Sequence, residues 1–200
     1  MMKSLDFLSV KRCSLLELLF LKVEGETWER ELDKLSSTDD NCMFGLRELW
    51  MSGTKIFEAG FPVGICPNLQ ILTLQSCSEL RQISCFTGLG KLEFLEMIQC
   101  DKVKDLPSFE PLVSLKQLWV VGCDEIKSIE GLGKLTKLRE LRVRKCHEIQ
   151  ELFGVEHIMS LKKLYIAGCP KLKWVNGVLE QLQLRLKQGF NVENKDGKDN

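Results

Sequence analysis

Histidine is scarce in this chain, net charge is absent, and so are long hydrophobic runs and glycosylation acceptors. The 200 residues include 2 His, and 28 Lys plus Arg balance 28 Asp plus Glu. A net charge of zero creates no overall field that would draw the protein to DNA, RNA or anionic lipid. Neither His147 nor His157 has a visible catalytic partner, which gives no support to Cys/His or Ser/His chemistry.

The N-terminal segment lacks the features of a leader or a membrane span. Its apolar residues are interrupted by Lys3, Asp6, Lys11, Arg12 and Glu17. Such a segment has neither the apolar core of a signal peptide nor the length of a transmembrane helix. The 9 cysteines are an odd number, and no Asn-x-Ser/Thr acceptor is present. We therefore expect a protein of the cytosol or nucleus with reduced thiols and no disulfides.

What is present is a repeat. Leucines recur at a constant spacing of 23 residues, at 46, 69, 92, 115, 138 and 161. Three residues after each stands another Leu, and five residues after stands Met, Leu, Val or Ile. The unit LxxLxLxxC followed by xxL is the leucine-rich-repeat pattern. Its alternating apolar residues predict short strands at 48–52, 71–75, 94–98, 117–121, 140–144 and 163–167.

The spacing also predicts the architecture. We expect an α/β-type repeat solenoid: a curved, right-handed leucine-rich-repeat coil with a parallel β-sheet on its concave side. Apolar residues at every third position on the return path favour an irregular or 3₁₀ convex side over long α-helices. A single repeat cannot offset the entropy of ordering its backbone, so stability depends on stacking.

Composition divides the chain into five segments. We predict a partial N-terminal repeat at 1–21, an irregular acidic insertion at 22–45, and six repeats at 46–183. A closing segment follows at 184–190 and a disordered polar tail at 191–200. Because the first repeat shows no polar cap, we expect an uncovered sheet edge and a fragment or truncated paralogue.

Six residues share one register position after the strands, and five of them are cysteines: Thr54, Cys77, Cys100, Cys123, Cys146 and Cys169. Neighbouring turns of a parallel sheet lie about 5 Å apart, so these side chains are expected to form a line. Four zinc ligands must instead converge on one point, and Thr is no zinc ligand. We predict a structural ladder of small hydrogen-bond donors and no metal site.

A glycine-rich string, GLGKLT at 131–136, raises the question of a phosphate loop. A Walker A motif requires GxxxxGK[ST], but Ser128 stands at the first Gly and Leu135 at the hydroxyl position. The same string at 88–92 departs in the same way, with Cys85 and Leu92. We interpret both strings as turns before a strand, with no nucleotide bound by this chain and no enzymatic activity.

The outward positions of the predicted strands suggest a binding surface. The central position of successive strands holds two Trp, a Tyr and an Arg, types that dominate protein-binding hot spots. The basic residues between 134 and 145 have three interpretations: a solvated surface, a protein-binding patch or a nucleic-acid site. Zero net charge disfavours the nucleic-acid site. The candidate partner-binding residues are Trp50, Thr73, Phe94, Glu96, Ile98, Trp119, Val121, Arg142, Arg144, Lys163 and Tyr165.

Three phrases carry a family resemblance: CPNLQILTLQSCSEL, EIKSIEGLGKLTKLREL and SLKKLYIAGCPKLKWV. They resemble the C-terminal repeats of plant nucleotide-binding, leucine-rich-repeat disease-resistance proteins, with a style closer to the Toll-type subgroup. The resemblance covers about residues 43 to 185. It implies recognition of a pathogen effector or guarded host protein and restraint of a switch domain. ADP or ATP would then bind that switch domain.

F-box adaptors of ubiquitin ligases also carry cysteine-bearing repeats and are the alternative. Their repeats tend to be longer, with a helix on the convex side, and no F-box precedes this array. For either class, the expected partner is a protein, with no nucleic acid and no membrane span.

Overall fold

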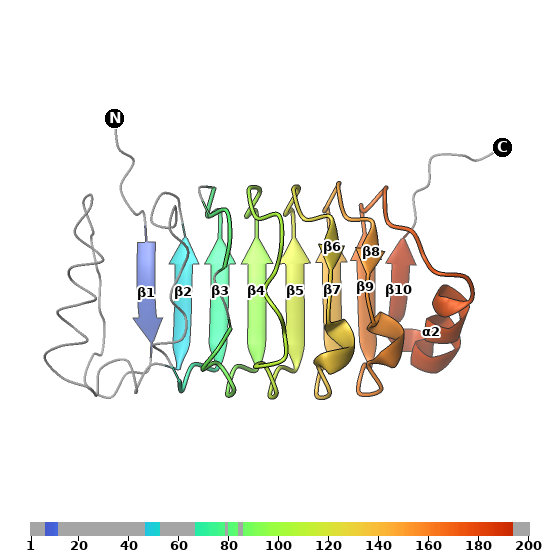
Figure 1. Ribbon diagram of the computed structural model, residues 1–200, viewed down its shortest axis with the longest axis horizontal. Coiled ribbons are helices and arrows are strands. Elements are labelled where there is room, and N and C mark those ends of the chain that lie inside the picture. The colour runs from blue at the N-terminus through green and yellow to red at the C-terminus, as the bar shows by residue number, and fades with distance from the viewer. Residues whose placement is uncertain (1–6, 12–46, 53–66, 79, 84–85, 194–200) are drawn as a thin grey trace, which may run out of the picture.

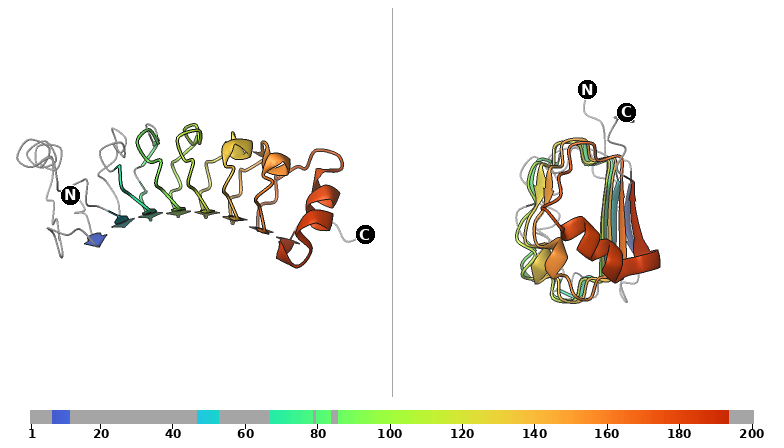
Figure 2. Two further views of the ribbon diagram at one scale, coloured as in Figure 1. Left: turned by 90° about the horizontal axis from the view of Figure 1, so that it is seen from below. Right: turned by 90° about the vertical axis from the view of Figure 1, so that its right-hand side faces the viewer.

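A computed structural model describes residues 7–11, 47–52, 67–78, 80–83 and 86–193. The described elements form a row of stacked turns, each contributing one strand to the main sheet (Figure 1). In side view the row bends into an arc whose inner side carries the strands, and in end view each turn is a closed loop (Figure 2). The predicted curved leucine-rich-repeat solenoid is therefore confirmed.

The main sheet contains eight strands in the order β1-β2-β3-β4-β5-β7-β9-β10. Six of them have the bounds that the leucine spacing predicts: β2 (Glu48–Ser52), β3 (Ile71–Gln75), β4 (Phe94–Ile98), β5 (Gln117–Val121), β7 (Glu140–Arg144) and β9 (Lys163–Ala167). These six pair in parallel, and each residue faces its equivalent 23 positions on. Equivalent side chains consequently lie in columns that cross the strands.

The core lies behind the sheet, inside the coil. In β4 the inward Leu95 and Met97 are fully buried, whereas Phe94, Glu96 and Ile98 are half-buried on the other face. The two Leu that open each repeat from Leu69 onwards, such as Leu115 and Leu118, are likewise buried. The strict alternation fixes the register, because a slip of one residue would turn every apolar side chain outward.

The convex side consists of short turns, as the three-residue period predicts. In the described return segments lie two 3₁₀ helices, η2 (Leu132–Lys134) and η3 (Val155–His157), and two short parallel strands, β6 (Ser128–Ile129) and β8 (Glu151–Leu152). Amides bond to carbonyls three residues earlier, as in Leu138 to Leu135 at 3.1 Å. A 3₁₀ period returns every third residue to the same side, which keeps the leucines in the core.

A left-handed residue directly follows each strand of the main sheet from β3 to β9. The residues at this position are Ser76, Gln99, Gly122, Lys145 and Gly168, with φ between 52° and 67°. The first four of their amides each donate to a carbonyl of the next turn at 2.8 Å. The turn thus joins consecutive repeats, but three of the five positions hold residues with a side chain that disfavours this conformation.

The two ends of the sheet differ from the predictions. β1 (Phe7–Lys11) pairs with β2 in the antiparallel sense, so it is not the start of a parallel repeat as we predicted for 1–21. It covers one edge of β2. At the other end β10 (Phe190–Glu193) pairs in parallel with β9, so the first residues of the predicted disordered tail are a strand. The predicted insertion at 22–45 lies outside the described residues.

An α-helix that the sequence analysis missed closes the last turn (Figure 2). α2 (Val178–Leu186) buries Leu182 and Leu186, four residues apart, and is followed by the 3₁₀ helix η4 (Lys187–Gly189). Its Arg185 guanidinium donates to the carbonyls of Glu156 at 3.0 Å and Ile158 at 3.2 Å. These bonds satisfy carbonyls at the end of η3 and hold α2 against the preceding turn.

Candidate functional site

The concave face is a grid of three columns that cross the strands. Its central column contains Trp50, Thr73, Glu96, Trp119, Arg142, Tyr165 and Asn191, each paired in register with the next. Phe94 and Lys163 belong to the column on one side of it. Ile98, Val121 and Arg144 belong to the column on the other. All eleven predicted partner-binding residues therefore lie on one face.

Four side chains of this face form a continuous stack. The Phe94 and Trp119 rings meet edge to face, 5.0 Å apart at 85°. The Arg142 guanidinium carbon lies 4.1 Å from the Trp119 ring centre and 4.8 Å from that of Tyr165. Cation–π contacts of this kind attract the cation to both rings. The four side chains are half-buried and held by one another. Few of their torsion angles remain to be fixed when a partner binds.

Glu140, two residues earlier on the same strand, also holds Arg142 in place. Arg142 Nη2 donates to Oε1 of Glu140 at 2.8 Å, and Lys163 Nζ lies 3.8 Å from Oε2 of the same carboxylate. Glu140 is only 6% exposed, so its charge is compensated mainly within the protein. Two donors of the stack, Trp119 Nε1 and Arg142 Nε, are buried without a hydrogen-bond partner. The sequence analysis missed Glu140, although its place on β7 beside two cations was a usable signal.

Thr73 contributes less surface than we predicted. It is 7% exposed, and its hydroxyl donates to Oε2 of Glu96 at 3.3 Å. Burial raises the pKa of Glu96, while the Thr73 hydroxyl and the positive charge of Arg142 act in the opposite direction. These two residues anchor one another, and Glu96 remains half-buried on the face.

The remaining candidates are accessible. Trp50 is 43% exposed, Arg144 and Lys163 are exposed, and Ile98 and Val121 are half-buried. Apolar side chains thus occupy the middle strands β4 and β5, and cations occupy β7 and β9. The surface combines a half-buried aromatic centre with a charged end, as expected of a protein interface.

The cysteine column forms a line inside the coil. Cys77, Cys100, Cys123, Cys146 and Cys169 are buried and unpaired by disulfides. Four of these thiols each lie 3.6 to 3.9 Å from a carbonyl of the preceding turn and 3.4 to 3.7 Å from one of their own turn. Among the described residues, no three His, Cys, Asp or Glu converge as metal ligands. Thr54 lies outside the described residues.

The backbone amides of the GLGKLT string at 131–136 make hydrogen bonds within the protein. The amide of Leu132 donates to the Phe153 carbonyl at 3.2 Å, and those of Lys134 and Leu135 bond within η2. A phosphate loop needs such amides free to surround an anion. Gly133 instead packs against Gly154 of the next turn, where an added Cβ on Gly154 would lie 2.9 Å from the Gly133 nitrogen.

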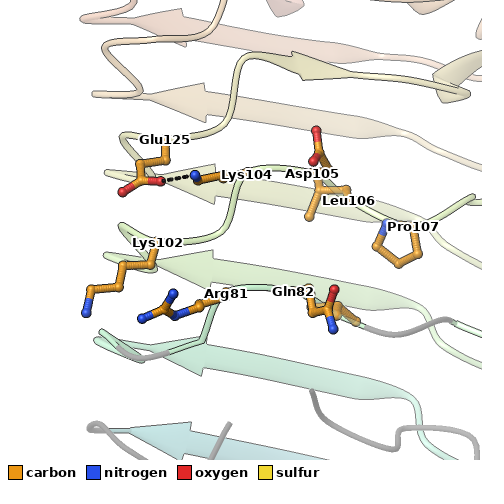
Figure 3. Close-up of a pocket in the computed structure, with 9 residues that line it drawn as sticks. Arg81, Gln82, Lys102, Lys104, Asp105, Leu106, Pro107 and Glu125 are labelled. Carbon is orange, nitrogen blue, oxygen red and sulfur yellow. Dashed lines mark ion pairs between the residues drawn. The ribbon is translucent and has the colours of Figure 1, made fainter. Parts of the chain in front are cut away.

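A hollow of about 620 Å³ lies between the return segments that follow β3, β4 and β5 (Figure 3). Charged side chains of both signs line it, including Arg81, Lys102 and Asp105. An ion pair of 3.7 Å between Lys104 and Glu125 crosses its rim. With mixed charge and largely exposed side chains, this hollow has no concentrated chemistry comparable to that of the concave stack.

In-register turns of 23 residues around a leucine core, with strands on the inner side of the arc, define a leucine-rich-repeat protein. Within the described part of the chain, no helix has the length and apolarity to cross a bilayer. No protein-family model matches the sequence, and no curated protein matches it. Among solved structures, the chain is similar to an internalin, inlF, from Listeria monocytogenes strain 4b F2365. That similarity has 16% identity and a TM-score of 0.33, covering 84% of this chain and 67% of the internalin chain.

Proposed function

We propose that this protein is a non-enzymatic recognition module that binds a protein partner on the concave face of β3 to β9. The stack of Phe94, Trp119, Arg142 and Tyr165 is the observation that carries the proposal. Trp, Tyr and Arg bury large areas on binding and provide most of the energy at protein interfaces. A stack already fixed by Glu140 loses little side-chain entropy when a partner arrives.

The finer proposal is a role in plant innate immunity. The repeat phrases resemble those of plant disease-resistance receptors, whose repeats sense a pathogen effector or a guarded host protein. In such a receptor the repeats also restrain a nucleotide-binding switch domain by direct contact, and ADP or ATP binds that domain. The place of action is the cytosol or the nucleus, where the five described thiols stay reduced.

A substrate-recognition role in an F-box ubiquitin ligase is the second candidate. Such repeats tend to be longer and to carry a convex helix. Here the convex side holds 3₁₀ helices of three residues and strands of two. The short return path supports the immune-receptor proposal over this alternative.

Selection of binders tests the concave face directly. The immobilised chain is used to select from a displayed library of protein fragments, and binding is titrated on variants. Trp119→Ala is expected to weaken selected binders about tenfold or more, because it removes the centre of the stack. Val113→Ala, which truncates a residue that is 55% exposed outside the three columns, is the matched control and should leave affinity unchanged. Binders that respond to neither variant would contradict the proposal.

The immune role has a separate test. The transcript that encodes this chain is read upstream of Met1 in the same frame. A nucleotide-binding switch domain there supports the receptor proposal, whereas an F-box supports the alternative. Nucleotide titration of this chain is expected to show no binding at micromolar ATP or ADP, and binding would contradict the assignment of nucleotide to another domain.

A further inference from the structure

The charges of the concave face are not evenly distributed. The outward positions of β7 and β9 hold three cations, Arg142, Arg144 and Lys163, and one anion, Glu140. Both carboxylate oxygens of Glu140 are engaged, one by Arg142 and the other by Lys163. The outward face of β7 and β9 is therefore positive, and the single carboxylate on these two strands is buried. The next carboxylate along this face is the exposed Glu193 of β10, in register with Ala167.

Two of these cations remain available to a partner. Arg144 is exposed, and within the described part of the chain its side chain makes no hydrogen bond or ion pair. Lys163 has a 56% exposed side chain and only a long contact of 3.8 Å to Glu140. Arg142 is different, because the 2.8 Å bond and two ring contacts hold it flat in the stack.

The two available cations lie on opposite sides of the stack. Arg144 is in register with Ala167, and Lys163 is in register with Glu140, four residues away along the strand. Four residues of strand span about 13 Å. Between the two cations lie Arg142 and Tyr165, and beside them Trp119 and Val121 form an apolar surface. The small side chain of Ala167 leaves Arg144 unobstructed on the β9 side.

We infer that the occupant of this end is an extended acidic peptide segment of the partner, a proposal that rests on the proposed function. Acidic residues at positions i and i+4 face Arg144 and Lys163, because four extended residues of the peptide also span about 13 Å. An apolar residue at i+2 points the same way and packs on the stack over Arg142 and Tyr165, whose positions Trp119 supports from β5. Charge complementarity at both ends fixes the register of the peptide.

Selection from a library of short random peptides on the full chain tests this pattern. The expected result is enrichment of Asp or Glu at i and i+4 with an apolar residue at i+2. A selected peptide should lose about tenfold or more in affinity on Arg144→Glu, and a comparable loss should follow when its own acidic residues are replaced by Gln on the unaltered chain. The second measurement remains informative if the variant fails to fold.

Lys127→Glu is the matched control. Lys127 is exposed immediately before β6 on the convex side, so reversal of its charge should leave affinity unchanged. An equal loss in this variant would mean that only net charge matters, which would overturn the proposal.

Two further outcomes separate this inference from the broader function. Peptides that depend on Trp119 but show no acidic enrichment would overturn the acidic partner and leave concave recognition standing. A set in which no binder depends on Trp119 would overturn both. Binding of a single-stranded uridine oligonucleotide that Trp119→Ala and Arg144→Glu both abolish would replace the peptide by a nucleic acid.

Discussion

Arg142 Nη2 lies 2.8 Å from Oε1 of Glu140, two residues earlier on the same strand, while its guanidinium lies between the Trp119 and Tyr165 rings. Residues two apart on a strand share one face, so the pair forms within β7 without help from the turns. The buried carboxylate fixes the position of the cation. The cation in turn fixes the two rings, and the concave centre is ordered before a partner binds.

Glu140→Ala is expected to lower the free energy of unfolding by about 1 to 3 kcal/mol, because Arg142 would lose its buried partner. Urea denaturation with an unchanged m-value would measure the loss. Glu148→Ala is the control. Its pair with Lys171, at 2.6 Å, has side chains 40% and 52% exposed, so the change should be at most about 0.5 kcal/mol. Equal losses in the two variants would show that Glu140 has no special role.

Lys145→Gly is expected to stabilise the protein by about 0.5 kcal/mol. A left-handed residue with a side chain is strained by about 1 to 2 kcal/mol, and the added chain entropy of glycine offsets part of the relief. The reverse change, Gly168→Ala, occupies the same turn position at φ 67° and should destabilise the protein. The urea midpoints of the two variants should therefore shift in opposite directions, and shifts of the same sign would refute the strain argument.

Gly154→Ala is expected to destabilise the protein by about 2 kcal/mol or more, because its Cβ would collide with the Gly133 backbone at 2.9 Å. Gly131→Ala separates collision from backbone strain. Gly131 also has a positive φ, of 72°, but an added Cβ meets nothing within 4 Å, so a smaller loss of about 1 kcal/mol is expected. Thermal unfolding of both variants measures the difference, and similar melting temperatures would show that the close approach of the turns is unimportant.

The buried thiol of Cys123 is expected to make the protein less stable at alkaline pH. Hydrogen bonding with Cys100, followed by burial, raises the pKa of Cys123 above its ordinary value of 9.0. The folded thiol stays protonated where the unfolded thiol ionises, so its contribution is complete below pH 9.0 and is lost as pH rises towards the folded pKa. The urea midpoint is therefore expected to decrease as the pH rises above 9.0, and to decrease less steeply in Cys123→Ser. An identical slope in the variant would show that other groups cause the fall.

The repeated part of the fold could be predicted because one pattern sets both register and burial. The spacing of Leu92 from Leu115 fixes β4 against β5, and with them the neighbours Glu96 and Trp119. Burial of single polar residues could not be predicted in this way. Thr73 and Glu140 occupy outward positions, but neighbouring side chains cover them, and coverage depends on rotamers that periodicity does not specify.

The ends of the coil were predicted less well for a different reason. A terminal element has one neighbour, so the same apolar spacing is compatible with either strand direction, and Phe7–Lys11 pairs antiparallel where we expected a parallel repeat. The helix at Val178–Leu186 takes the place of the return path between β9 and β10. Its buried Leu182 and Leu186 have the four-residue spacing of a helix, a signal that the expected three-residue period obscured.

The constant spacing of 23 residues also bears on how such a protein can change through recombination. Deleting residues 93–115 would join Leu92 to Lys116, which normally follows Leu115, so the new junction reproduces a native one. The turns that carry β3 and β5 would become neighbours, and their core positions are equivalent, with Leu72 and Leu74 beside Leu118 and Val120. Only one member of each concave column would disappear. Unequal crossover between repeats would thus remove or add whole repeats, and with them residues of the concave face, while the scaffold continues to fold.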